Sequence, residues 1–340
     1  MDKLREIIDF DTLDISKFYL GKISENYYHE KRFIKDKIEG DTLDINFYLN
    51  SKKEEKQLID IVLNQDKTVL LGNPGIGKTK ELEVLFKTLW ERKNELEIIP
   101  FFININIFRN SKNFEDLIKY KDWKDFEKKC FIIDGLDEIP DPQDFISALK
   151  FFLENYNESI KIIISCRTNI YEKYLLRIDD FEYYYLNNLS DLQIINILKN
   201  TFAINITFED LDKYRVFLEN PFNLNLFGHF YKENQKFPQT IFEAFELSID
   251  QELILLNKKK FVKSELIDEI HAKHILTEIA IINELMHQNY IESEDLYNLI
   301  GKEDKSLIEK ISLIEKNQDS KKFIFRHQNY QEFLSAKYIS

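Results

Sequence analysis

Glycine is scarce in this chain, with only eight residues among 340. Three of the eight, Gly72, Gly75 and Gly77, stand within one octapeptide. Because glycine lets the backbone adopt conformations that side chains prevent, a chain this poor in glycine is expected to use it where the main chain itself must act. The octapeptide 72–79 is therefore the first candidate for a functional loop.

Cysteine and long apolar runs are also rare. The two cysteines, Cys130 and Cys166, fall in expected core strands, so they read as small buried residues and exclude a disulfide framework or a cysteine metal site. No apolar run reaches the roughly 18 residues that a membrane helix needs. The N-terminus, residues 1–6, is charged and lacks the apolar segment of a signal peptide. We therefore expect a cytoplasmic protein without a membrane partner.

Basic residues are outnumbered by acidic ones. The chain has 47 Lys and Arg against 60 Asp and Glu, a formal net charge of −13. This balance argues against binding of nucleic acid or anionic membrane over the whole surface, although a local basic patch stays open. With 44% hydrophobic residues the composition is globular, and the length suffices for two or three domains.

The octapeptide fits the pattern G-x-x-x-x-G-K-[ST] of the phosphate-binding P-loop. It consists of Gly72, Asn73, Pro74, Gly75, Ile76, Gly77, Lys78 and Thr79. In such a loop the main-chain N–H groups surround a polyphosphate, and the following helix points its positive end at the same anion. Lys78 would reach the β- and γ-phosphates of ATP or ADP, and the Thr79 hydroxyl would bind Mg²⁺.

The surrounding pattern supplies the strand and helix that a P-loop requires. Apolar, β-branched segments predict strands at 67–71, 97–105, 129–133, 160–166 and 182–186. Helices are expected near 78–93, 113–128, 143–156 and 168–176, preceded by one from Ser51 to Asn64 with a capping box at Ser51 and Glu54. This alternation predicts an α/β fold with a parallel sheet covered by helices on both faces.

After Ser190, which is expected to cap a helix, the pattern becomes almost wholly helical. Amphipathic segments predict helices at 207–218, 222–233, 240–257, 263–288 and 293–300. A strand pattern returns at 322–326, and a last helix begins near Tyr330.

A second motif follows the third predicted strand. The apolar run from Cys130 to Ile133 ends in Asp134, Gly135, Leu136, Asp137 and Glu138. An acidic residue at the carboxyl end of a strand beside the P-loop is where a Mg²⁺ partner belongs, which predicts Asp134 as a metal ligand. Glu138 is the expected general base for the attacking water, with Asp137 beside it.

The stretch 131–138 resembles the signature of NACHT-domain NTPases, a group within the STAND class of signalling ATPases. Further segments are similar to motifs of that family. Residues 162–167 resemble its sensor-1 strand, which implies that Arg167 faces the γ-phosphate; the family's usual proline after this arginine is Thr168 here. Residues 219–224 imply that Pro221 lies near the adenine. Residues 325–336 imply that His327 contacts the β-phosphate of ADP.

The resemblance covers residues from about 67 to 336 and implies a domain order. An N-terminal extension, 1–50, has no assigned role. It is followed by a P-loop domain at 51–188 with an ASCE-type five-stranded parallel sheet, a small helical domain at 189–257 and a winged-helix domain at 258–340. The last domain is expected to stop within its C-terminal helix, so that the chain could belong to a longer receptor.

The resemblance further implies a switch that binds and slowly hydrolyses ATP with Mg²⁺. ADP would hold the closed state through His327, ATP would engage Arg167 and favour self-oligomerisation, and Glu138 would reset the state. Antiphage defence is the role expected at the family level, with an unknown trigger and effector. Two alternatives stay open: a nucleotide-locked interaction scaffold with negligible turnover, and an AAA+-like remodelling or DNA-repair motor.

Overall fold

The fold is described from a computed structural model. It covers residues 13–19, 30–32, 34–36, 56–105, 113–139, 142–156, 160–168, 170–171, 178, 180–258, 268–286, 288–309, 311, 313–317, 321–325 and 327–339. The chain divides into two compact units, Met1–Asn187 and Asn188–Ser340. The described residues form one hydrophobic core cluster in the first unit and two in the second. None of the helices in the described ranges combines the length and apolar character needed to span a bilayer.

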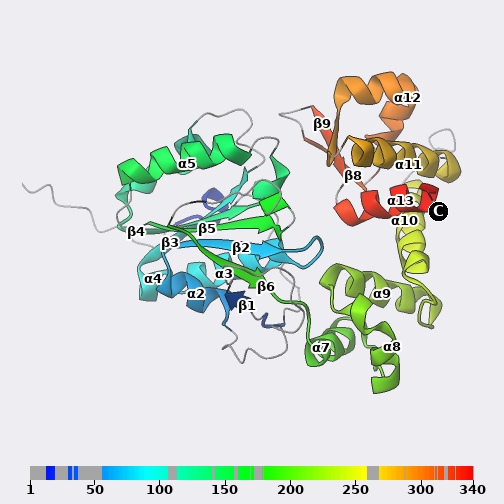
Figure 1. The fold of residues 1–340 in the computed structure, drawn as a ribbon, viewed down its shortest axis with the longest axis horizontal. Helices are drawn as coiled ribbons and strands as arrows, with labels where there is room; N and C mark the ends of the chain where they lie inside the picture. The colour runs from blue at the N-terminus through cyan, green and yellow to red at the C-terminus, as the bar shows by residue number, and fades with distance from the viewer. Residues whose placement is uncertain are drawn as a thin grey trace, which may run out of the picture. The chain divides into compact units, whose positions relative to one another are not determined.

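The first unit is built on a six-stranded sheet in the order β1-β6-β2-β5-β4-β3 (Figure 1). Five strands are parallel and only β1 runs antiparallel, against β6. The strands are β1 (Ile34–Asp36), β2 (Lys67–Gly72), β3 (Ile98–Asn104), β4 (Lys128–Asp134), β5 (Ile160–Arg167) and β6 (Glu182–Leu186). The predicted α/β P-loop fold with an ASCE-type parallel sheet is confirmed, and each predicted strand is present within two residues of its expected bounds.

Helices lie on both faces of this sheet. Figure 1 shows α5 (Pro142–Tyr156) on one face, and α2 (Leu58–Asn64), α3 (Lys78–Glu91) and the short α4 (Lys93–Leu96) on the other. The strand interiors carry almost unbroken Val, Leu, Ile and Phe because a sheet covered on both faces offers no solvated side. The core therefore holds the strand ends, where the polar motifs lie, in fixed positions.

The helix predicted at 113–128 is wrong. Two 3₁₀ turns occupy this segment instead, η4 (Phe114–Leu117) and η5 (Trp123–Asp125). Phe114 and Trp123 are both buried, but nine residues in one α-helix would turn them about 180° apart. Two separate turns let both rings pack against Phe152 of α5 and Phe131 of β4.

The helix predicted from Ser51 begins later than expected. Helix α2 starts at Leu58 after Gln57, whose backbone is extended. Lys56 forms an antiparallel bridge with Ile34, so the chain is still paired as a strand where the helix was expected. The predicted cap at Ser51 and Glu54 lies outside the described residues, as does most of the helix predicted at 168–176.

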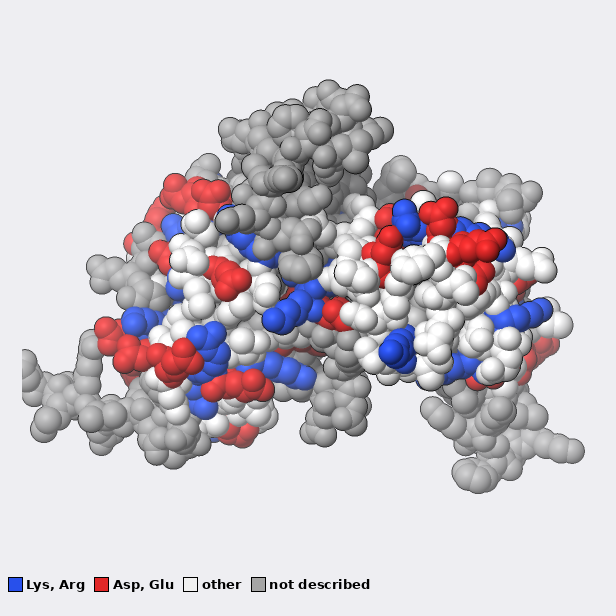
Figure 2. All heavy atoms as spheres, turned by 90° about the horizontal axis from the view of Figure 1, so that it is seen from below, with Lys and Arg blue, Asp and Glu red and all other residues white. Residues whose placement is uncertain are grey.

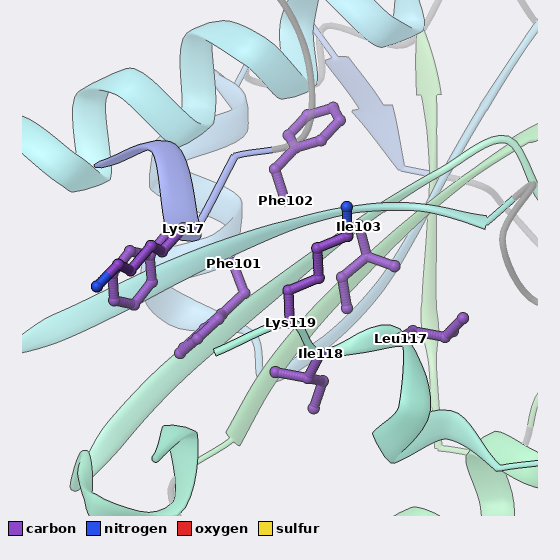
Figure 3. A pocket seen from close by; sticks show the side chains of 8 residues that line it. Lys17, Phe101, Phe102, Ile103, Leu117, Ile118 and Lys119 are labelled. Carbon is purple, nitrogen blue, oxygen red and sulfur yellow. The ribbon is translucent and has the colours of Figure 1, made fainter. Parts of the chain in front are cut away.

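Part of the N-terminal extension packs into this unit. The 3₁₀ turn η2 (Ile15–Lys17) leads into Phe18 and Tyr19, which are buried among the aromatic rings of α3 and β3. Tyr19 bridges Phe102 in parallel, and the Phe102 N–H donates to the Phe18 carbonyl at 2.8 Å. A small, mostly apolar pocket lies at this junction (Figure 3), lined by Lys17, Phe18, Phe101, Phe102, Ile103, Leu117, Ile118 and Lys119. Residues of the extension thus pair with β3 at one edge of the sheet and, as β1, form the opposite edge beside β6.

The second unit is mainly helical. Its helices are α7 (Asp191–Phe202), α8 (Phe208–Leu218), α9 (Pro221–Asn234), α10 (Ile241–Lys258), α11 (Glu269–Leu285), α12 (Ser293–Ile308) and α13 (Gln328–Ile339). Ser190 caps α7, as predicted, and it forms a complete capping box with Gln193. A three-stranded antiparallel sheet, β7-β9-β8, completes the unit with β7 (Tyr290–Glu292), β8 (Ile314–Asn317) and β9 (Lys322–Phe325). Strand β7 was not predicted, and α12 continues past its expected end across a kink at Gly301.

Candidate functional site

The predicted P-loop connects β2 to α3. Strand β2 ends at Gly72 and α3 begins at Lys78. Gly75 and Gly77 have φ angles of 73° and 95°, a left-handed conformation that a side chain would strain. Because Gly77 is the N-cap of α3, the free N–H groups of the first helical turn face the loop. The scarce glycines therefore stand where the backbone needs them, and the loop offers main-chain donors to an anion.

Lys78 lies over this loop. Its ammonium donates to the Gly72 carbonyl at 2.9 Å and to the Asn73 carbonyl at 3.4 Å. Burial lowers the pKa of Lys78, and the nearby Arg167 guanidinium lowers it further, while the charge of Asp137 opposes the shift. A bound polyphosphate would stabilise the ammonium form, so the site favours an anionic ligand beside Lys78.

The two predicted metal ligands lie together. The Thr79 hydroxyl, at the start of α3, lies near the Asp134 carboxylate at the end of β4. Burial raises the pKa of Asp134, while the hydroxyls of Ser165 and Thr79 lower it. Oxygen donors from a carboxylate and a hydroxyl suit Mg²⁺, which prefers one or two protein oxygens together with water and phosphate. The residues present therefore fit the predicted ion, which would also favour the ionised carboxylate.

Ser165 is a site residue that the sequence interpretation did not single out. It is fully buried in β5, where its hydroxyl donates to Asp134 Oδ1 at 2.6 Å and accepts from the Gly135 N–H at 2.8 Å. These two bonds fix one oxygen of the carboxylate and the turn that follows it. A serine after three consecutive isoleucines was the available signal, since a buried hydroxyl needs a partner.

Arg167, at the end of β5, forms an ion pair with Asp137, the middle residue of the turn η6 (Leu136–Glu138). Arg167 Nε lies 2.6 Å from Asp137 Oδ2, and the Arg167 N–H donates to Asp137 Oδ1 at 2.9 Å. The Asp137 side chain is only 5% exposed and that of Arg167 16%. Asp137, which was predicted to stand beside the general base, thus holds the predicted sensor residue Arg167 in position.

The register of the sheet explains why these groups meet. Gly72 of β2 pairs with Arg167 of β5, and Asp134 closes the neighbouring β4. Parallel strands bring their carboxyl ends to one edge, so residues about 60 to 95 positions apart in sequence converge there. The predicted base Glu138 ends η6 at the same edge, but its side chain lies outside the described residues.

Pro221 and His327 belong to the second unit. Pro221 opens α9 directly after Asn220, whose side chain accepts from the N–H groups of Phe222 and Asn223. His327 is exposed just before α13, and its ring lies 4.9 Å from that of Phe222. These two predicted nucleotide contacts, distant in sequence, therefore both adjoin Phe222, Pro221 as its neighbour in the chain and His327 through its ring. Their roles toward a nucleotide stay predictions.

Comparisons with known proteins show only a broad similarity to solved structures. Neither a family model nor a curated protein matches the chain. Similar solved structures include the Aeropyrum pernix ORC1 protein in complex with DNA, at 12% identity and TM-score 0.38, covering 82% of this chain and 89% of that one. AMPPCP-bound DnaA from Aquifex aeolicus is 11% identical with a TM-score of 0.39, and the match covers 70% of this chain and 80% of that one. A Thermotoga maritima RuvB variant is 14% identical with a TM-score of 0.34, and the match covers 78% of this chain and 86% of that one. At such identities and TM-scores the likeness carries no argument about function, and the fold class rests on the strand order and the P-loop itself.

Proposed function

We propose that this protein binds ATP and ADP with Mg²⁺ and hydrolyses ATP slowly as a regulatory switch. The observation that carries the proposal is the convergence of Lys78, Thr79, Asp134 and Arg167 at one edge of the parallel sheet. Buried charges are costly unless a partner compensates them. A triphosphate with its metal ion supplies both compensating charges at once.

Each residue has a distinct task in the proposed reaction. The loop N–H groups and Lys78 would hold the β- and γ-phosphates, and Arg167 would neutralise charge that develops on the γ-phosphate. Mg²⁺, when bound by Thr79 and Asp134, would withdraw charge from the phosphate oxygens. Ser165 orients Asp134 through its 2.6 Å hydrogen bond. Glu138 would take the proton of the attacking water.

The switch itself rests on differential contacts with the two nucleotides. We propose that ADP is held with the help of His327 and Pro221, and that ATP gains contacts with Arg167 in their place. The ATP-bound form would then self-associate and act in bacterial antiphage defence, as the resemblance to NACHT-domain proteins suggests. This output is a proposal drawn from that resemblance.

The first test is nucleotide binding by Lys78→Ala. We expect this variant to lose binding of Mg²⁺–ATP measured by calorimetry, because the ammonium contacts the phosphates directly. Lys128→Ala is the matched control, since Lys128 is exposed at the opposite end of the same sheet, where it pairs with Glu97. Equal ATP affinity of Lys78→Ala and the unmodified protein would overturn the proposal.

The second test separates a switch from a scaffold or a motor. We expect the purified protein to contain ADP, and its mass in solution to rise when Mg²⁺–ATP replaces ADP. His327→Ala should weaken ADP binding by roughly 10-fold, the size of a lost charge-assisted hydrogen bond, and leave ATP binding unchanged. Bound ADP without any phosphate release would favour the scaffold, and fast continuous turnover would favour the motor.

A further inference from the structure

Arg32 joins two distant segments of the first unit from the N-terminal extension. One arm of its guanidinium, NH1, donates to the carbonyl of Ile76 at 3.0 Å. The other arm, NH2, donates to the carbonyl of Asn187. Ile76 is the central residue of the P-loop, between Gly75 and Gly77, and Asn187 is the last residue of the unit. A single buried side chain, 6% exposed, therefore bridges both.

We propose that Arg32 is a positioning residue that sets the P-loop and couples it to the point where the first unit ends. The proposal rests on the proposed nucleotide function for its effect on ATP, but the coupling between the two segments stands on the geometry alone. The sequence carried no signal for it, since residues 1–50 match no motif.

The planar fork of arginine suits this task. Its N–H donors point in fixed directions, so that two arms reach two carbonyls with one rigid group. A carbonyl turned toward Arg32 leaves the opposite face of the loop for N–H groups, which is the face that would bind phosphate. Glycines flank Ile76 and give the loop little rigidity of its own, so an external hydrogen bond has a large influence on its conformation.

The backbone beside Arg32 is itself fixed. Two residues later, Ile34 begins β1 and pairs with Leu186 of β6, directly before Asn187. On its other side Ile34 bridges Lys56 through reciprocal backbone hydrogen bonds of 3.0 and 3.4 Å. Ile34 is 1% exposed. Arg32 thus extends from an anchored strand, so a shift of the loop carbonyl is transmitted to β1 and to the end of β6.

Arg32 therefore links the nucleotide-binding loop mechanically to the residue at which the chain leaves the first unit. A nucleotide that moves the backbone at Ile76 changes the hydrogen bond to Arg32, and the same guanidinium holds Asn187. The link also works in reverse, because coupling between two sites is reciprocal. A force or partner that displaces the N-terminal extension would then lower the affinity of the P-loop for nucleotide.

The test compares Arg32→Gln and Arg32→Lys with Arg92→Gln in the full chain. Arg92→Gln is the control, because it removes the same side chain from an exposed pair with Glu95 on the same unit. Hydrogen exchange without nucleotide reports peptides that cover 72–79 and 184–190, and steady-state kinetics with Mg²⁺–ATP gives KM and kcat. We expect Arg32→Gln to accelerate exchange in both segments and to raise KM about 10-fold with kcat within about twofold. Arg32→Lys, which keeps the charge but not the fork, should lie between.

Three outcomes would overturn the proposal. The first is unchanged exchange in Arg32→Gln at either segment. The second is faster exchange over the whole unit, which means a merely structural role; if Arg32→Gln does not fold, Arg32→Lys decides the same question. The third is an unchanged KM with intact turnover. If the unmodified protein binds no ATP, the proposed function fails, while coupled exchange at the two segments still upholds the link.

Discussion

The P-loop edge of the first unit and the 325–336 segment of the second unit both carry a sequence motif, but their motif residues behave differently. At the P-loop edge the motif residues are charged or polar groups that interact with one another, such as Asp137 with Arg167 and Asp134 with Thr79. In the second unit most of the motif is core. Tyr330, Phe333 and Leu334 are buried, and Gln331, 1% exposed, bonds to Asn283 and Glu284 of α11.

The two motifs therefore differ in how strongly they indicate a function. Buried charges that face each other need a ligand or a partner to be stable, so their geometry points to chemistry. Buried aromatic and amide groups are satisfied by the fold itself, so their pattern is explained by packing alone. His327 is exposed within that second set, and its role has to be measured.

Figure 2 shows that acidic and basic side chains are interspersed over the described residues of the face drawn, without a continuous basic area there.

The largest effect is expected from Glu138→Gln at the P-loop edge. The change keeps the size of the side chain but removes the proposed base, so turnover should fall by about 10²–10⁴-fold while ATP binding stays. Phosphate release and calorimetry measure the two quantities. Glu154→Gln, on an exposed position of α5, is the control and should behave as the unmodified protein. Unchanged hydrolysis in Glu138→Gln would remove Glu138 from the mechanism.

Breaking one ion pair in each unit should destabilise the two units by different amounts. Asp137→Asn leaves Arg167 without its carboxylate near Lys78, so unfolding without nucleotide should be easier by roughly 2–3 kcal/mol. Asp191→Asn breaks the exposed pair with Arg215, 2.9 Å apart on α7 and α8, and should cost less than about 1 kcal/mol. Denaturant melts measure both.

Added ATP supplies the discriminating readout for this pair. Phosphate takes over the neutralisation of Arg167, so ATP should stabilise Asp137→Asn more than it stabilises the unmodified protein. For Asp191→Asn the gain should equal that of the unmodified protein. Equal gains in all three proteins would contradict a charge-compensating role of the ligand.

In the second unit, we expect changes in packing to affect stability more than changes in charge. A Cβ at Gly228 would lie 2.5 Å from the ring of Phe202, so Gly228→Ala should destabilise the unit by about 1–3 kcal/mol. Combining it with Phe202→Leu makes room and should recover part of the loss, which a double-mutant cycle measures. ATP binding should be unaffected. Purely additive effects of the two changes would contradict the contact.

The smallest effect is expected from the pH dependence of the second unit. The hydrogen bond to Asp304, 2.8 Å long, raises the pKa of His271 above its ordinary value of about 6.5. A raised pKa in the folded state means that the proton stabilises the fold below the unfolded value, and that this gain is lost as the pH rises through the folded one. The Tm difference between the unmodified protein and His271→Gln should therefore shrink above about pH 6.5. His274→Gln on the same helix is the control, and a constant difference would contradict the assignment.

The strands were the most predictable part of the fold. Five apolar runs, each bounded by polar residues, gave strands within two residues of their observed ends, because strands covered on both faces must be apolar throughout. The helix expected at 113–128 failed for a related reason. Its apolar residues matched a helical spacing locally, but the two halves had to face the same core, which the sequence pattern did not express.

By itself the sequence established which residue types stand at the P-loop edge: the glycines, Lys78, Thr79 and Asp134 follow a local pattern of the chain, in which each residue type suits the group that we propose it binds. Only the tertiary structure decided what holds these residues in place. Ser165 on Asp134, Asp137 on Arg167 and Arg32 on Ile76 are contacts between residues 30 to 44 positions apart. Their partners are set by strand order and register, which arise from the packing of the whole sheet and which no local pattern encodes.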